Sequence, residues 1–189
     1  MTPGRRSVLA GLAATAFTPV APFDGRARAL EGDMMMKAGD LDWIYLADTV
    51  MGGVSEGQAS TEDGVLRLTG TVSTENRGGF IQARTYFDQG LPEDTTGLRL
   101  RVRGNGERYF VHIRTVLTVL PWQYYQAGFE TGPDWADVTI GLSEFEAPSR
   151  ILPAAPAPAL VRSIAVVAYG RDHVADLSVA ALGLVSGGT

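Results

Sequence analysis

The sequence predicts an all-β fold, a sandwich or jelly roll of packed sheets, and three observations support this prediction. Several short segments alternate between apolar and polar residues, as strands with one buried face do. The chain of 189 residues contains 23 glycines and 10 prolines, which place turn signals between these segments. No segment shows an apolar stripe with the 3.6-residue period of an amphipathic helix. Strands separated by frequent turns are typical of sandwiches and jelly rolls.

The clearest strand covers residues 97–103, where leucine and valine alternate with three arginines. We expect residues 108–120 to return beside it after the turn at 104–107, so that the two form a hairpin. Residues 148–158 are rich in proline and are expected to form a loop, because proline lacks the amide donor that a central strand needs. Residues 30–42 are expected to be a lead-in, and the other expected strands are 43–46, 65–72, 79–87, 122–129, 135–142, 160–169 and 177–185.

The titratable residues offer little catalytic or metal-binding chemistry. The chain has no cysteine, which excludes disulfides, thiolate catalysis and Cys-ligated zinc, and its two histidines are His112 and His173. Asp48, Glu75 or Asp176 could supply oxygen ligands to a structural calcium, but no loop has the ligand density of a calcium site. No nucleophile stands beside a base, and no basic patch is interleaved with aromatic residues. We therefore expect no catalytic residue, no metal, no cofactor and no nucleic-acid partner.

Residues 1–29 have the features of an export signal. Arg5 and Arg6 precede a weakly apolar stretch rich in alanine and glycine, and residues 27–29 place small side chains where a signal peptidase cleaves. The Arg-rich composition also fits a mitochondrial presequence, but the paired arginines favour the twin-arginine export route. Cleavage would leave one domain, residues 30–189, in the periplasm. It would lower the formal net charge from −5 to −8, because four arginines and one aspartate are removed.

Alternation also predicts which polar side chains share a face. Successive side chains of a strand point to opposite sides of the sheet, so burying Tyr109, Val111 and Ile113 turns His112 and Arg114 outward. If the strands belong to one sheet, the outward residues converge as a polar-aromatic face that could grip a sugar or a partner loop. A solvated sheet face with cross-strand pairs is the alternative. The predicted face consists of Gln82, Arg84, His112, Arg114, Tyr124 and Gln126.

Two polar stretches, 48–55 and 73–80, each contain a Gly-Gly pair next to an expected strand. Local chemistry alone favours turns that shape the fold, because adjacent glycines supply positive φ or allow close approach. Asp48-Thr49-Val50-Met51-Gly52-Gly53-Val54-Ser55, followed by Asn76-x-Gly78-Gly79-Phe80 and by Leu98-Arg99-Leu100-Arg101-Val102-Arg103-Gly104-Asn105-Gly106, resembles the signature of the thirty-kilodalton complex I intermediate-associated protein family. Tyr125-Gln126-Ala127-x-Phe129 and Trp135 extend the resemblance over nearly all of residues 43–189.

This resemblance implies a galactose-binding-like β-sandwich, a jelly roll shared with some carbohydrate-binding modules, and a non-enzymatic role. Mitochondrial members help to assemble the membrane arm of respiratory complex I, NADH:ubiquinone oxidoreductase. We therefore expect a chaperone-like factor whose partner is a protein, with a respiratory-complex subunit or assembly intermediate as the candidate. The resemblance implies binding through the family motif, that is Asp48, Thr49, Met51, Gly52, Gly53, Ser55, Asn76, Gly78, Gly79 and Phe80.

An export signal would place this member on the other side of the membrane from the mitochondrial factor, so its partner can differ. The alternative hypothesis is an exported carbohydrate-binding module that uses the polar-aromatic face.

Overall fold

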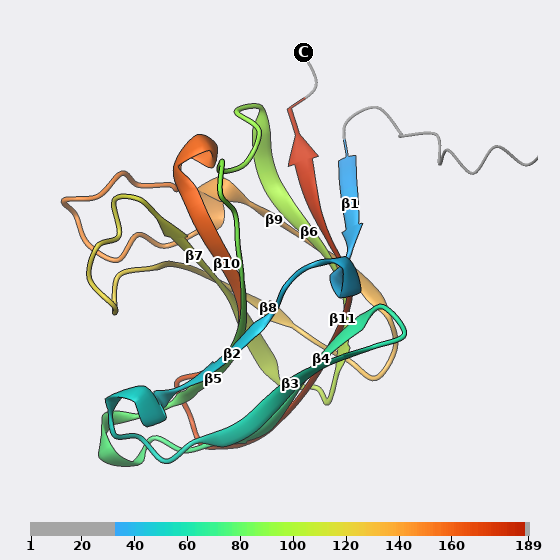
Figure 1. The fold of residues 1–189 in the computed structure, drawn as a ribbon, viewed down its shortest axis with the longest axis vertical. Helices are drawn as coiled ribbons and strands as arrows, with labels where there is room; N and C mark the ends of the chain where they lie inside the picture. Colours follow the sequence, from blue (N-terminus) through green and yellow to red (C-terminus); the bar gives the residue numbers. More distant parts are fainter. Residues whose placement is uncertain (1–32, 188–189) are drawn as a thin grey trace, which may run out of the picture.

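The structure, a computed structural model, describes residues 33–187, and the predicted export signal at 1–29 lies outside this range. Two antiparallel sheets face each other as a sandwich, and the described residues contain only short 3-10 turns besides the strands (Figure 1). The all-β prediction is confirmed. No helix in this part of the chain is long and apolar enough to cross a membrane.

The first sheet is built around its longest strand, β11 (His173–Ser186). One side of β11 pairs with β6 (Thr95–Gly104), and the other pairs first with β4 (Val65–Val72) and then with β1 (Asp33–Lys37). In Figure 1, β1 and the end of β11 lie side by side. The edges of this sheet are β3 (Glu56–Glu62) beside β4 and β9 (Ala136–Gly141) beside β6.

The second sheet has the strand order β2-β5-β10-β7-β8. Its central strand, β10, is buried on both faces, because residues 164–168 are all apolar and covered. The sheet positions the candidate site, since the predicted polar-aromatic residues come from three of its strands and, for Tyr124, from the loop before β8. The bounds are Ile44–Ala47 for β2, Phe80–Tyr86 for β5, Val161–Tyr169 for β10, Arg108–Thr115 for β7 and Tyr125–Glu130 for β8.

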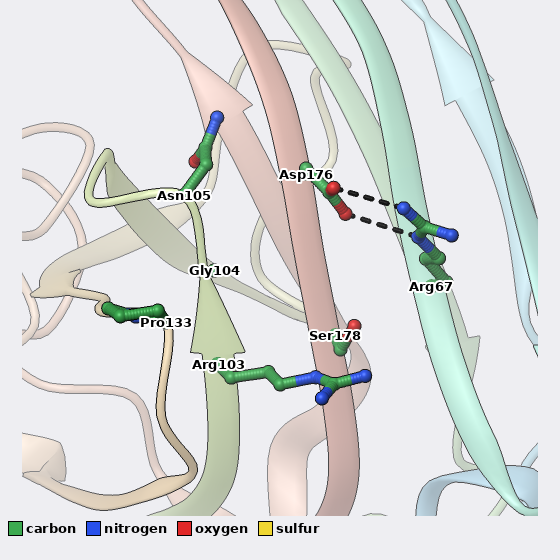
Figure 2. Close-up of a pocket in the computed structure, with 7 residues that line it drawn as sticks. All are labelled: Arg67, Arg103, Gly104, Asn105, Pro133, Asp176 and Ser178. Atoms are coloured by element: carbon green, nitrogen blue, oxygen red, sulfur yellow. Dashed lines mark hydrogen bonds and ion pairs between the residues drawn. The ribbon is translucent and has the colours of Figure 1, made fainter.

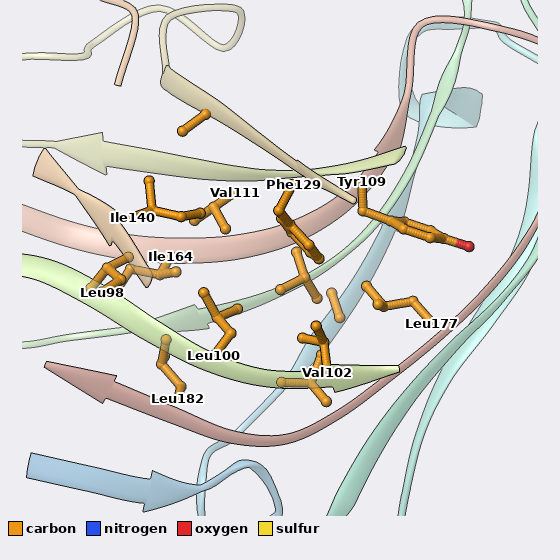
Figure 3. Close-up of a cluster of buried hydrophobic side chains, with 14 of the residues drawn as sticks. Leu98, Leu100, Val102, Tyr109, Val111, Phe129, Ile140, Ile164, Leu177 and Leu182 are labelled. Atoms are coloured by element: carbon orange, nitrogen blue, oxygen red, sulfur yellow. The ribbon is translucent and has the colours of Figure 1, made fainter. Parts of the chain in front are cut away.

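The core lies between the sheets (Figure 3). Leu98, Leu100 and Val102 point from β6 toward Tyr109 and Val111 of β7. Phe129, Ile140, Ile164, Leu177 and Leu182 extend the same cluster. Tyr109, Val111, Ile113, Tyr125, Ala127 and Phe129 are all buried, as the alternation predicted. Burial of large side chains at about 1.5–3 kcal/mol each is the main stabilising contribution to such a fold.

One expected pairing is wrong. Residues 97–103 and 108–120 do not form a hairpin, because β6 belongs to the first sheet and β7 to the second. The turn between them, with Gly106 at φ +86°, carries the chain across the sandwich instead of folding it back. In addition, β7 ends at Thr115.

Other element boundaries also differ from those expected. Residues 122–124 precede β8, β11 starts at His173, and the lead-in contains β1. Strand β3 was not predicted at all.

Candidate functional site

The predicted polar-aromatic residues share the outer face of the second sheet. Ala165 of β10 lies opposite Arg84 of β5 on one side and His112 of β7 on the other. His112 in turn lies opposite Gln126 of β8. Because Ala165 is short, the long side chains of its neighbours cover it, and it is almost completely buried. The expectation that these strands belong to one sheet is therefore confirmed.

His112 is the centre of this face, and it is buried rather than solvent-exposed as the sequence suggested. It is 5% exposed because the ring of Tyr124 stacks flat on it, with the ring centroids 3.9 Å apart and an interplanar angle of 10°. Its Nε2 and Oε1 of Gln126 are 2.9 Å apart. Burial and, to a lesser extent, the positive charge of Arg84 lower the pKa of His112 to about 3, although the hydrogen bond with Gln126 acts in the opposite direction. His112 is therefore neutral at physiological pH.

Tyr124 is half-buried and forms a small aromatic cluster with its neighbours. Tyr169 meets the rings of His112 and Tyr124 edge-on, at centroid distances of 5.6 and 6.4 Å. Burial and the hydroxyl of Tyr169 raise the pKa of Tyr124, so the phenol is protonated at physiological pH. Such a cluster gives the face a rigid ring surface with polar groups beside it.

Two arginines flank the cluster, and neither pairs with a carboxylate of the described residues. Arg84 donates from Nη2 to Oε1 of Gln82 at 3.1 Å, while its buried Nε has no hydrogen-bond partner within residues 33–187. Burial and the charge of Arg84 lower the pKa of Arg114. Arg114 donates from Nη2 to the carbonyl oxygens of Thr118 and Leu120, at 2.6 and 3.0 Å. Around the cluster this face therefore carries two arginine charges that no carboxylate of the described residues pairs, and Arg114 fixes the loop beside it.

That loop, residues 116–124, exposes apolar side chains although its backbone is well fixed. Thr118 is buried and donates from Oγ1 to the carbonyl oxygen of Thr115 at 2.8 Å. The loop points its polar groups inward and its apolar groups into solvent, with Val119 76% and Trp122 66% exposed. Val116, Leu117 and Leu120 are also exposed. This surface is not apparent from the sequence, because an apolar run at 116–120 has the composition expected of a continued strand.

The family motif is organised around Asp48, whose side chain has no solvent exposure. Its Oδ1 accepts a hydrogen bond from the amide of Ser55 at 3.0 Å, and its Oδ2 accepts from the Ser55 hydroxyl at 2.5 Å. The amides of Gly79 and Phe80 donate to the same oxygen at 2.5 and 3.2 Å. Burial opposes the charge of Asp48, but these four hydrogen bonds outweigh it and lower the pKa of this carboxyl.

The glycines of the motif fit closely around this carboxylate. A Cβ on Gly53 or Gly78 would overlap the Asp48 side chain. Gly52 has a φ of +90°, which favours glycine. The hydrogen bonds to buried Asp48 thus hold the segment 49–55 against the segment 73–80. The exposed motif residues are Thr49, Met51, Gly52 and Asn76, and these are available to a partner, whereas Ser55 and Gly79 are buried and Phe80 is half-buried.

The other residues considered for metal binding or catalysis lie apart. Asp176 pairs with Arg67, Asp48 is enclosed by donors, and Glu75 is exposed. Within residues 33–187, no three His, Cys, Asp or Glu side chains form a group that could hold a metal ion. His173 begins β11 and is half-buried, with Nδ1 2.8 Å from the carbonyl oxygen of Arg171.

A comparison with protein families gives one match. The family model described as "Complex I intermediate-associated protein 30" matches residues 33–169, most of the chain. The chain belongs to this family. No curated protein sequence matches it.

Solved structures similar to this family member include carbohydrate-binding modules. The family 11 carbohydrate-binding module of the cellulase Lic26A-Cel5E of Clostridium thermocellum has a TM-score of 0.64 and 13% identity, over 82% of this chain and 95% of that module. A family 30 carbohydrate-binding module has a TM-score of 0.51 and 12% identity, over 71% and 92%. An agarase, AgWH50C, has a TM-score of 0.60 and 8% identity, over 84% of this chain and 25% of that enzyme. At these identities the likeness establishes the jelly-roll sandwich alone.

Proposed function

We propose that this member of the complex I intermediate-associated protein 30 family is a non-catalytic, chaperone-like assembly factor that holds a protein partner. The observation that carries the proposal is the loop 116–124, where Thr118 and Arg114 fix a backbone that presents exposed apolar side chains. Exposed apolar patches on soluble proteins often mark protein interaction sites. Because the loop is already ordered by these bonds, binding would cost little conformational entropy.

A neighbouring loop extends this surface. This loop, residues 147–158, is hydrogen-bonded to the start of β8: the hydroxyl of Tyr125 donates to the carbonyl oxygen of Pro153 at 3.1 Å. Ile151 in this loop is 94% exposed. Figure 1 shows the two loops at the same end of the sandwich. The partner surface would then combine these apolar tips with the cationic face of Arg84 and Arg114.

The family description makes a respiratory complex I subunit or assembly intermediate the first candidate for the partner. The test is affinity purification of the tagged full-length chain from its native cells, with quantification of co-purified complex I subunits. Val119→Asp should reduce this recovery at least fivefold. Val174→Asp is the matched control, because Val174 is 65% exposed but lies on β11. Equal recovery with both variants would contradict a role of the loop.

A second candidate function, carbohydrate binding, is favoured by the flat ring of Tyr124, which stacks on His112 where His112 contacts Gln126. Aromatic rings next to fixed polar groups suit small-ligand sites. The fold shared with carbohydrate-binding modules is compatible with this function. Tyr124→Ala should then abolish retention on a glycan array, whereas Val119→Asp should leave this retention unchanged. Absence of glycan retention by the wild type, or equal retention of wild type and Tyr124→Ala, would eliminate this second function.

We also propose that residues 1–29 are a twin-arginine export signal and that the mature protein acts in the periplasm. The paired Arg5-Arg6 and the small residues at 27–29 support this. Cell fractionation with N-terminal sequencing tests it. A mature protein beginning near Leu30 in the periplasm would direct the search to envelope-facing partners, whereas an uncleaved cytoplasmic chain would refute the export proposal.

A further inference from the structure

The outer face of the first sheet carries a cleft between two arginines. The candidate site described above lies on the other sheet. Arg67 of β4 and Arg103 of β6 lie opposite Ser178 of β11, one on each side. Because Ser178 is short, the two long side chains border a cleft of about 270 Å³. Gly104, Asn105, Pro133 and Asp176 complete its lining (Figure 2).

The two arginines differ in how their charges are compensated. Arg67 donates from Nε and Nη2 to the two carboxylate oxygens of Asp176, at 3.1 and 3.0 Å. Arg103 forms no ion pair or hydrogen bond with the described residues. Its guanidinium instead lies 4.8 Å from the ring centroid of Trp135, which holds the group without neutralising it. Figure 2 shows the side chain of Arg103 extending past Ser178.

Internal hydrogen bonds fix the wall and floor of the cleft. The amide of Asp176 donates to the hydroxyl of Tyr109 at 2.9 Å, and this hydroxyl donates to Oδ1 of Asn105 at 2.8 Å. Asn105 donates from Nδ2 to the carbonyl oxygen of Val174 at 2.7 Å. The hydroxyl of Ser178 is left without a hydrogen-bond partner in the part of the chain that the structure describes. The cleft therefore offers one fixed, uncompensated guanidinium and one free hydroxyl.

We propose that this cleft binds a carboxylate group. A guanidinium presents two parallel N–H donors that match the two oxygens of a carboxylate, and the Ser178 hydroxyl can donate a further hydrogen bond. The charges of Arg67, Asp176 and Arg103 sum to one positive charge, which a monoanion neutralises. A phosphate dianion would overcompensate this charge and would meet the carboxylate of Asp176, so a carboxylate is the better match. The site does not depend on the function proposed above.

The experiment is an NMR titration of the ¹⁵N-labelled protein at constant ionic strength, following the Nε–H signal of Arg103 and the amide of Ser178. The probes are sodium acetate, the peptide acetyl-Gly-Glu-Gly-amide, glucuronate and inorganic phosphate. We expect saturable shifts with the first three and weaker binding of phosphate. If the peptide binds with higher affinity than glucuronate, the natural carboxylate belongs to an acidic side chain. If glucuronate binds with higher affinity, it belongs to an acidic sugar.

The matched variants are Arg103→Gln and Arg101→Gln. Arg101 lies on the same strand but pairs with Asp137 at 3.3 Å and does not line the cleft. Arg103→Gln should weaken carboxylate binding at least tenfold, while Arg101→Gln should change it less than twofold. Shifts that do not saturate, equal losses in the two variants, or tighter binding of phosphate than of acetate would each overturn the proposal. Both arginines are exposed, so neither substitution should impair folding.

Discussion

Mild acid should destabilise this protein at a pH where most carboxylates are still ionised, and the cause should be His112. This side chain is enclosed by Tyr124, Gln126 and Tyr169, and burial lowers its pKa to about 3 in the folded state. In the unfolded chain the pKa of a histidine is about 6.5. Below pH 6.5 the unfolded state therefore binds a proton that the folded state does not. The free energy of unfolding consequently decreases as the pH is lowered.

The size of the effect follows from the two pKa values. The free energy of unfolding should fall by about 1.4 kcal/mol for each pH unit once the pH is well below 6.5. Between pH 7.5 and 4.5 the total loss from His112 should be about 2.7 kcal/mol. Asp48 contributes little in this window, because its stabilising charge is lost only as the pH falls below the carboxylate pKa of about 4.

Urea unfolding of the wild type and of His112→Gln at several pH values measures this contribution. The variant loses the ring stack on Tyr124, so its stability should be lower at pH 7.5. Its pH dependence should be weaker, because the group that titrates in the unfolded state is gone. The reasoning would be refuted if the difference in unfolding free energy between the two proteins were constant from pH 7.5 to 4.5. It would also be refuted if the imidazole of His112 titrated near pH 6 in the folded protein.

Three further predictions concern the motif, the core and the exposed loop. Asp48→Asn should lower the free energy of unfolding by about 3–5 kcal/mol in urea, because an amide nitrogen would face the donors of Ser55, Gly79 and Phe80. A loss below about 1 kcal/mol would contradict the role of Asp48 in holding the two segments together. Leu100→Ala, at a fully buried position of β6, should cost about 2–5 kcal/mol by the same assay, and a near-neutral result would contradict the described core. Trp122→Ser should leave stability within about 0.5 kcal/mol of wild type, because the ring is exposed, yet it should lower partner recovery; a large loss of stability would show that the ring is packed.

The face of the candidate site could be predicted from sequence because alternation in strands is strict. Burying Tyr109 and Tyr125 was enough to place His112 and Gln126 on the opposite side, and the structure pairs these two residues. The burial of His112 could not be predicted, because it depends on Tyr124 folding back onto it from the preceding loop. Similarly, the close fit of Gly78 around Asp48 depends on a contact between two segments that lie far apart in the sequence.

The pairing of strands that lie far apart in the chain is the feature that the sequence predicts least well. Strand β3 has both faces largely exposed at the sheet edge, so its sequence lacks the alternation that reveals half-buried strands. The turn at 104–107 has the composition of a hairpin turn, but β6 and β7 find their partners elsewhere in the chain. An apolar run such as 116–120 has the same composition whether it is a buried strand or an exposed loop, so its exposure required the structure.

The measurement that tests the central proposal most directly is site-specific photocrosslinking in native cells. A photoreactive residue would replace Val119 in the exposed loop, and a control would replace Thr61, which is exposed on the edge strand β3. The proposed function predicts a crosslink from position 119 to a respiratory complex I subunit or assembly intermediate, identified by mass spectrometry, and none from position 61. Absence of a protein adduct at 119, or the same adducts from both positions, would contradict it.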